Sequence, residues 1–270
     1  MTPVPLTQKE NAVSMFALVV RTLVVAAAAL PQATQALCTL DSPQQRAALV
    51  ELYTSEGCNS CPPADLWLSR LRTDSAGRRI VALAFHVDYW NQLGWVDRFS
   101  QPAFSERQRQ IATRGRSRVI YTPQVVLDGK DSRNWSNSGS FARSVAELNR
   151  KPAGARITAT ASLSGADLQL RGAIELESAA PSAAVWVAVF QNGLITTVAA
   201  GENAGRTLEH DFVVRTLAGP LPVQRDASLL LDRTLRVASD WDAAQLGVAV
   251  FVQDRRTGEV LQAVSGVSCL

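Results

Sequence analysis

Two cysteines separated by two residues, Cys58 and Cys61, have the spacing in this chain that most clearly suggests chemistry. They follow a strand-like apolar run, 48–53, and precede a helix-like segment, 64–71. Thiol–disulfide exchange uses two thiols at such a strand-to-helix step, because one sulfur attacks a substrate and its neighbour resolves the mixed disulfide. The spacing therefore predicts redox chemistry. A buried structural disulfide and half of a metal site are the alternatives.

The N-terminal segment has the features of an export signal. Lys9 and Arg21 accompany an apolar run over residues 15–30, and its uninterrupted part is too short to span a membrane. We predict a signal peptide over 1–36 and a periplasmic or secreted mature chain without a membrane span; an uncleaved anchor is the alternative. Cleavage removes these two cations and Glu10, so the formal net charge falls from +3 to +2, which is too small to indicate nucleic-acid binding.

All four cysteines lie beyond the predicted cleavage point, and an oxidising compartment allows them to pair. If Cys58 pairs with Cys61, then Cys38 and Cys269 remain, one near each end of the mature chain. We predict a structural disulfide between these two. Lipid modification of Cys38 is the alternative, although the bulky Leu37 before it is a poor fit.

The sequence changes character near residue 152. Before that point strand-like and helix-like segments alternate. The expected elements there are 50–54, 62–72, 80–87, 102–113, 125–127 and 140–149. After it, short segments alternate apolar and polar residues with a period of two. We therefore predict an α/β domain over 37–152, with a mixed sheet flanked by helices, and an all-β antiparallel sandwich over 153–270.

His86 ends the predicted strand 80–87, at the edge where open α/β sheets build their sites. It could act as a proton acceptor for Cys61 or an electrostatic partner for Cys58. It could also be a third ligand beside the two sulfurs, a set that suits Cu(I) or Zn(II). The third possibility is a hydrogen-bonded residue that organises the loop 88–95. The sequence leaves these three roles open.

Several motifs together carry a resemblance to a known family. They are ELYTSEGC (51–58), CPPAD (61–65), HVDYW (86–90), GW (94–95), YTPQ (121–124) and GENAGR (201–206), with His210. The mature chain resembles the secreted bacterial family catalogued as domain of unknown function 1223. Its members are similar to thioredoxins in their first half and carry a β-rich second domain. The resemblance implies a thioredoxin-like fold, export and a CxxC site, and no established substrate.

The resemblance also assigns roles residue by residue. Cys58 matches the attacking thiol of thioredoxin-like proteins, Cys61 the resolving thiol, and Pro123 the cis-proline held against the sulfurs; a plain turn proline is the alternative. The two prolines after Cys61 depart from thioredoxin and predict that the helix begins at Pro62 or Pro63. The expected substrate groove contains Thr122, Trp90 and Trp95.

A basic run of five arginines lies between Arg107 and Arg118, with only Glu106 nearby. A solvated surface is the favoured interpretation, and an anionic partner is the alternative.

Taken with the resemblance, these features predict an exported thiol–disulfide oxidoreductase that acts on unidentified envelope proteins and uses no cofactor. A copper or zinc metallochaperone that binds its metal through Cys58, Cys61 and His86 is one alternative. A non-enzymatic binding scaffold with a permanent CxxC disulfide is the other.

Overall fold

Two apolar runs of the sequence form the central strands of the region that carries the cysteines. In the computed structural model, β2 (Ala48–Thr54) and β3 (Ile80–His86) pair in parallel, with α1 (Pro62–Arg70) between them in the chain. Every residue of β2 is buried, which is the pattern of a strand covered on both faces. The end of β2 therefore places the CxxC segment at the start of α1.

The structure describes residues 1–3, 5, 37–73, 79–223 and 228–267. Most of the predicted signal peptide and Cys269 lie outside the described residues. Cys38 lies in β1 (Leu37–Asp41), and its predicted disulfide with Cys269 stays a prediction. Among the described residues, no helix is long and apolar enough to cross a membrane.

Eight strands form one mixed sheet in the order β14-β13-β8-β11-β3-β2-β4-β5. Its other strands are β4 (Gln124–Leu127), β5 (Lys130–Asp131), β8 (Ala183–Gln191), β11 (Val213–Pro222), β13 (Leu246–Asp254) and β14 (Val260–Val267). A four-stranded antiparallel sheet in the order β1-β6-β7-β12 adds β6 (Ala155–Ser164), β7 (Asp167–Leu176) and β12 (Ser228–Arg236). A separate hairpin pairs β9 (Leu194–Thr197) with β10 (Thr207–His210).

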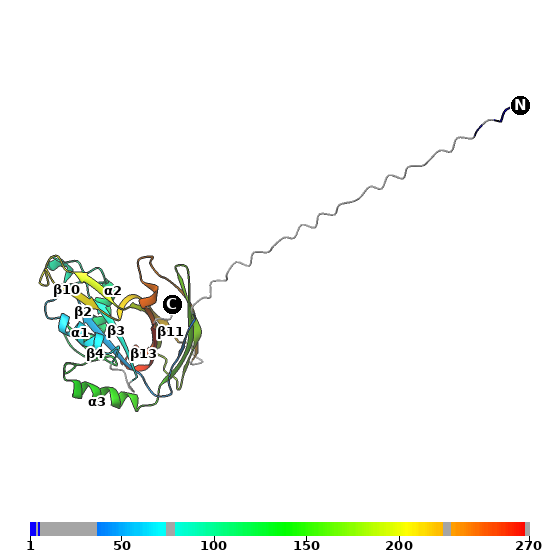
Figure 1. The fold of residues 1–270 in the computed structure, drawn as a ribbon. Helices are drawn as coiled ribbons and strands as arrows, with labels where there is room; N and C mark the ends of the chain where they lie inside the picture. Colours follow the sequence, from blue (N-terminus) through cyan, green and yellow to red (C-terminus); the bar gives the residue numbers. More distant parts are fainter. Residues whose placement is uncertain (4, 6–36, 74–78, 224–227, 268–270) are drawn as a thin grey trace. The chain divides into compact units, whose positions relative to one another are not determined.

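Two more α-helices, α2 (Pro102–Arg114) and α3 (Ser138–Asn149), complete the helices of the described residues, apart from short 3-10 turns at Asn91–Leu93 and Ala243–Gln245. Figure 1 shows the three helices beside β2, β3 and β4. The helices therefore lie in the part of the sheet that carries the cysteines.

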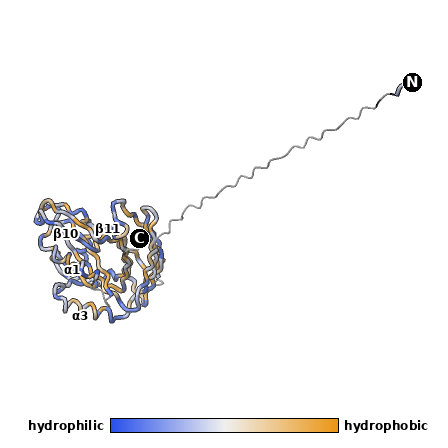
Figure 2. The backbone as a smooth tube through the Cα atoms, in the orientation of Figure 1, coloured by the Kyte–Doolittle hydropathy of each residue, from blue (hydrophilic) through white to orange (hydrophobic). Residues whose placement is uncertain are grey.

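The strands β8 and β13 are apolar along most of their length, which is the pattern of strands whose two faces are both buried. In β8, Val185, Val187 and Val189 belong to a core shared with the four-stranded sheet, whereas Trp186 and Phe190 belong to the core around β2 and β3. In Figure 2 the apolar, orange stretches run through the middle of the folded part. One sheet thus separates two hydrophobic cores.

The predicted fold class, an α/β thioredoxin-like domain followed by an all-β antiparallel sandwich, is wrong. The described residues are mostly β, with large mixed and antiparallel sheets, and a thioredoxin-like α/β core is not shown. Strands from both halves share the eight-stranded sheet, in which β3 pairs in parallel with β11 at Ala84 and Val213. The physical reason for this pairing is that the backbone groups of β3 on the side away from β2 need hydrogen-bond partners. The segment at β11 supplies them, and the N–H of Ala84 donates to the carbonyl of Phe212 at 2.8 Å. The limits of the two predicted domains stay predictions.

The local elements of the first half were predicted more successfully than the fold. The helix after the cysteines begins at Pro62, as predicted, and α2 begins at Pro102. The turn Asp128-Gly129 joins β4 to β5, and both residues have a positive φ, which a tight two-residue hairpin turn requires. The helix starts and the hairpin turn therefore lie where the local sequence predicted them.

Candidate functional site

Cys58 and Cys61 form a disulfide in the turn between β2 and α1, with their Cα atoms 5.4 Å apart. The helix begins at Pro62, directly after Cys61, where a missing N–H costs no hydrogen bond. Both cysteines are 0 % exposed, although Asn59 and Ser60 between them are exposed. The disulfide therefore lies just below the surface and out of reach of another protein in this conformation.

The loop between β9 and β10, residues 198–206, covers the cysteines and is called here the β9–β10 loop. The side-chain amide of Asn203, itself 0 % exposed, donates to the carbonyl oxygens of Glu56 (2.8 Å) and Cys58 (2.9 Å). Arg206 donates to the other end of this amide, at 2.8 Å, and so fixes its orientation. A segment distant in the chain thus binds the backbone on the N-terminal side of the disulfide.

Two further contacts hold the β9–β10 loop against this region. The N–H of Asn59 donates to Glu202 at 3.1 Å. Gly201 packs so closely on Trp95 that an added Cβ would lie 3.2 Å from the Trp95 Cβ atom, and its φ of 74° also favours glycine. The loop therefore fits against the CxxC turn and the loop that follows β3.

Five buried titratable side chains gather around the CxxC turn. They are Glu56, Asp65, His86, Asp97 and His210. The Nδ1 atom of His86 lies 2.6 Å from Asp97, whose carboxylate also accepts from the N–H of Glu56. His210 lies 3.4 Å from Glu56 and 4.0 Å from Asp65, and its ring meets that of His86 edge to face at 5.0 Å. Carboxylates and imidazoles from both halves of the chain form one cluster.

Burial and charge act on these groups in opposite directions. Burial alone would lower the pKa of His86, but the charge and hydrogen bond of Asp97 outweigh it and raise the pKa. Burial alone would raise the pKa of Asp97, and the same pairing lowers it. Burial alone would also raise the pKa of Glu56, but its contacts with His210, Thr196 and Trp95 together outweigh burial and lower the pKa. For Asp65 burial prevails, so its pKa is raised although both histidines favour its charged form.

The cluster retains unused hydrogen-bonding capacity. The Nε2 atom of His86, both ring nitrogens of His210 and one carboxylate oxygen of Glu56 are buried without a hydrogen-bond partner. The 3.4 Å contact between His210 and Glu56 has the distance of an ion pair and not the geometry of a hydrogen bond. Among these groups, raised pKa values favour the protonated forms of His86 and Asp65, whereas lowered pKa values keep Asp97 and Glu56 ionised.

The structure brings most of the predicted groove residues to this region. The peptide bond between Thr122 and Pro123 is cis, and Pro123 is partly exposed. Trp90 donates to the Thr122 hydroxyl at 2.7 Å, and its Cβ would lie 3.2 Å from a Cβ added at Gly57. Trp95 donates to Glu56 at 2.8 Å. Trp90 thus connects the proline step with the segment before the cysteines, and the functional roles of these residues stay predictions.

Sequence reasoning did not identify three residues that build this site. Asp97, which holds His86, lies in a loop, and no pattern of spacing connects it with the histidine. Asn203 and His210 stood in motifs of the family resemblance, but the sequence did not show which groups either side chain contacts. A buried polar residue needs partners, and that rule identifies them only once the fold is known.

The metal alternative has no further support here. In the part of the chain that the structure describes, no group of three or more His, Cys, Asp or Glu is arranged to hold a metal ion. Cys58 and Cys61 are bonded to each other, and Asp97 occupies the Nδ1 atom of His86.

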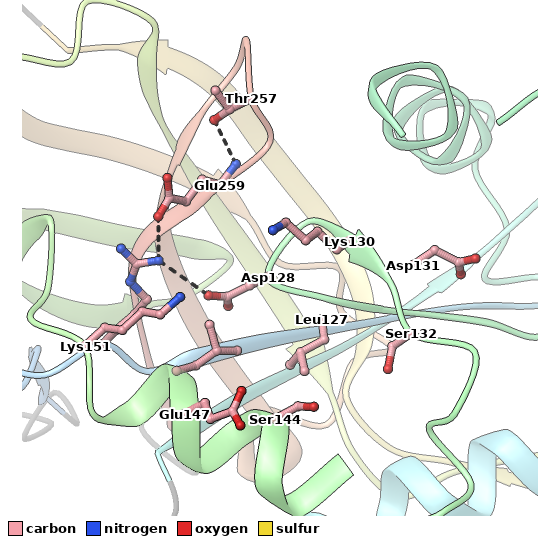
Figure 3. A pocket seen from close by; sticks show the side chains of 12 residues that line it. Leu127, Asp128, Lys130, Asp131, Ser132, Ser144, Glu147, Lys151, Thr257 and Glu259 are labelled. Carbon is pink, nitrogen blue, oxygen red and sulfur yellow. Dashed lines mark hydrogen bonds and ion pairs between the residues drawn. The ribbon is translucent and has the colours of Figure 1, made fainter. Parts of the chain in front are cut away.

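A cavity of about 440 Å³ lies at the other end of β2 (Figure 3). There Asp128 accepts from the N–H of Leu49 at 2.9 Å, and Arg46 lies between Asp128 (3.9 Å) and Glu259 (2.8 Å). Leu49 and Thr54 are five residues apart in an extended strand, about 17 Å. This cavity is therefore separate from the disulfide.

The family model described as a protein of unknown function, DUF1223, matches residues 49–253. The chain belongs to this family. The match includes the CxxC turn, the β9–β10 loop and all five buried titratable residues of the cluster. The whole candidate site therefore lies within the part of the chain that the family model covers. No curated protein matches the chain.

Two solved structures are similar to this family member in fold. A crystal structure of a protein from Agrobacterium tumefaciens has a TM-score of 0.53 and 23 % identity, over 84 % of this chain and 96 % of that one. HBP35 of Porphyromonas gingivalis has a TM-score of 0.64 and 11 % identity, over 84 % of this chain and 76 % of that one. At these identities the similarity shows the fold alone.

Proposed function

We propose that this protein is an exported thiol–disulfide oxidoreductase that exchanges disulfides with envelope proteins through Cys58 and Cys61. The observation that supports the proposal is the placement of the disulfide beside a buried cluster in which the pKa values of Asp65 and His86 are raised, so that these two groups retain their protons to a higher pH than they would in water. A permanent disulfide needs no proton acceptor, because it neither gains nor loses protons. Burying carboxylates and imidazoles also costs free energy, and a disulfide with only a structural role does not require such groups beside it.

The proposed exchange follows from the chemistry of the two sulfurs. A substrate thiolate attacks Cys58, a substrate–Cys58 disulfide forms, and Cys61 leaves as a thiolate. A second substrate thiolate then attacks the substrate sulfur of that mixed disulfide and releases Cys58. Two substrate thiols become one disulfide, and the Cys58–Cys61 pair gains two electrons and two protons. The reverse sequence reduces a substrate disulfide.

Asp65 is the proposed proton donor to Cys61 in the first of these steps. It lies one helical turn after Cys61, and its backbone N–H donates to the Cys61 carbonyl at 3.2 Å. Burial raises the pKa of Asp65, so its carboxyl retains a proton at a higher pH than an exposed aspartate does. His210 lies 4.0 Å from the Asp65 carboxylate, beyond direct hydrogen-bond reach, so a proton passing between the two side chains would need one intervening water.

Exchange requires the β9–β10 loop to withdraw, because Cys58 is fully buried beneath the surface. The two hydrogen bonds from Asn203 hold the loop to the backbone beside the disulfide. A net stabilisation of about 1 kcal/mol for each such bond is small enough for the loop to open at a useful rate. We therefore propose that substrate binding or spontaneous opening exposes Cys58.

A binding scaffold with a permanent CxxC disulfide is the second candidate, and the complete burial of both cysteines favours it. It differs from the first candidate in one respect that can be measured. A permanent disulfide forms no mixed disulfide with any partner, and its removal leaves the binding of partners unchanged.

Trapping of mixed disulfides tests the proposal. Cys61→Ser is expressed in the cell envelope and leaves Cys58 without its resolving partner. We expect adducts on non-reducing gels that disappear with reductant, and none from the matched Cys58→Ser, Cys61→Ser control. Absence of adducts, together with failure of the wild-type protein to oxidise or reduce a dithiol peptide, would favour the scaffold and end the oxidoreductase proposal.

A further inference from the structure

A second region, independent of the disulfide and its proposed function, has the properties of a binding site. It is a groove of about 820 Å³ between α2, the second half of β11 and the turn after β13. We call it the α2 groove. The α2 residues that line it, among them Glu106, Gln110, Thr113 and Arg114, recur at intervals of three and four and so share one face of the helix.

The charge of the α2 groove is strongly unbalanced. Four arginines line it, Arg107, Arg109, Arg114 and Arg255, against the single carboxylate of Glu106. Four cations against one anion leave a formal excess of three positive charges on the lining. Such a concentration of one sign in a concave surface raises the local concentration of ions of the opposite sign.

Two of the four arginines already have acidic partners. The guanidinium of Arg107 lies 2.6 Å from Glu51 in a buried ion pair, and Glu51 lies on the interior side of the groove lining. Arg109 pairs with Glu106 at 2.9 Å on the exposed side of the helix. Glu51 does not line the groove, so it neutralises Arg107 from the interior. The surplus that remains belongs to Arg114 and Arg255.

Of the four arginines, Arg114 is the one whose guanidinium is partly buried and yet lacks an acidic partner among the described residues. It is partly buried, its Nε atom is buried without a hydrogen-bond partner, and no carboxylate of the described residues forms an ion pair with it. Burial and the neighbouring charge of Arg107 lower its pKa, which is the sign of a cation in unfavourable surroundings. Its place at the C-terminal end of α2 offsets part of this cost.

Arg255 completes the opposite side of the groove. It is exposed, it follows β13 in the chain, and in the described residues only its backbone N–H is engaged, by the carbonyl of Ser182. Arg114 and Arg255 therefore present two guanidinium groups to one groove from different elements, and neither is neutralised by the fold. Guanidinium groups bind phosphate and carboxylate oxygens in pairs of parallel hydrogen bonds.

We propose that the α2 groove binds a small anion with two or more negative charges, carried by phosphate or carboxylate groups, between Arg114 and Arg255. Such an anion supplies the missing partner of Arg114 and neutralises the surplus charge. Phosphate and carboxylate share this chemistry, and the probes tested distinguish them. The basic run seen in the sequence thus divides into a part that lines the groove and a part, Arg116 and Arg118, that lies outside its lining.

Calorimetric titration of the whole mature protein with tripolyphosphate, and separately with citrate, at low ionic strength tests the proposal. We expect binding of at least one probe, weakened at least tenfold in Arg114→Gln and in Arg255→Gln, and weakened by added salt. Arg118→Gln removes the same charge from an exposed position outside the lining and should bind as the wild type does. Because Arg255 is exposed, its variant should fold normally even if Arg114→Gln does not.

The outcomes are decisive in both directions. Binding of tripolyphosphate alone assigns the groove to phosphate, and binding of citrate alone assigns it to carboxylates. No binding of either probe at millimolar concentration overturns the proposal. An equal loss of affinity in Arg118→Gln and Arg255→Gln would also overturn it, because the effect would then come from net charge and not from the groove.

Discussion

Buried charged groups lie at both ends of β2, but the carboxylates at one end lie beside an arginine and those at the other end lie beside histidines. At the first end Asp128 lies beside Arg46, which also binds Glu259. At the second end, beside the disulfide, carboxylates lie against His86 and His210. A guanidinium stays charged at every physiological pH, whereas an imidazole gains and loses its proton near neutrality. The first arrangement suits a fixed brace, and the second suits proton transfer.

The two ends should also respond differently to pH. The raised pKa of His86 contributes stability that is complete below about pH 6.5 and is lost as the pH rises through the folded value. The lowered pKa of Asp97 contributes stability above about pH 4 that is lost as the pH falls. The disulfide end is therefore most stable in mildly acidic solution.

The largest expected effect comes from breaking the pair at the disulfide end. Asp97→Ala removes the partner of His86 and the acceptor of the backbone N–H groups of Glu56 and Phe99. We expect the free energy of unfolding to fall by about 3 to 5 kcal/mol, the usual cost of leaving a buried charge unpaired. Urea denaturation at pH 6 measures it. Asp97→Asn keeps an acceptor oxygen and should lose less; a loss below about 1 kcal/mol in Asp97→Ala would contradict this account.

A smaller effect of opposite sign is expected at the other end of β2. Burial raises the pKa of Asp128 to about 6, so this carboxyl contributes stability below about pH 4 that is lost as the pH rises through 6. Asp128→Asn keeps the bond to Leu49 and tolerates the positive φ. It should stabilise the protein at pH 8 by at most about 3 kcal/mol and change little at pH 4.

Urea denaturation at these two pH values checks this prediction. Glu259→Gln removes a neighbouring charge from an exposed position and serves as the control, since it retains the Asp128 carboxyl. Equal shifts at pH 4 and pH 8 in Asp128→Asn would mean that ionisation of Asp128 does not limit stability there.

The sequence predicted local features of the site because their causes are local. The two prolines place the start of α1, and the spacing of Cys58 and Cys61 predicts their disulfide. His86 was singled out because it ends an apolar strand, where polar side chains often serve function. Each of these inferences depends on residues within a few positions of one another.

The remaining features depend on contacts between distant segments, and periodicity does not report which segments meet. The pairing of β3 with β11 joins Ala84 to Val213, and it overturned the predicted fold class. Asn203 reaches Cys58 across 145 residues of chain. The apolar runs 185–190 and 248–252 predicted buried strands, as found in β8 and β13, but they could not show that the two faces of these strands pack in two different cores.

The rate at which a mild thiol reduces the Cys58–Cys61 disulfide tests the central claim most directly. Glutathione reduction of the wild type and of Asn203→Ala is followed by alkylation of the new thiols under conditions in which both proteins stay folded. Our account predicts slow but measurable reduction of the wild type and at least tenfold faster reduction of Asn203→Ala, because the variant loses both hydrogen bonds from Asn203 to the backbone beside the disulfide. Equal rates, or resistance of both proteins until they unfold, would contradict it.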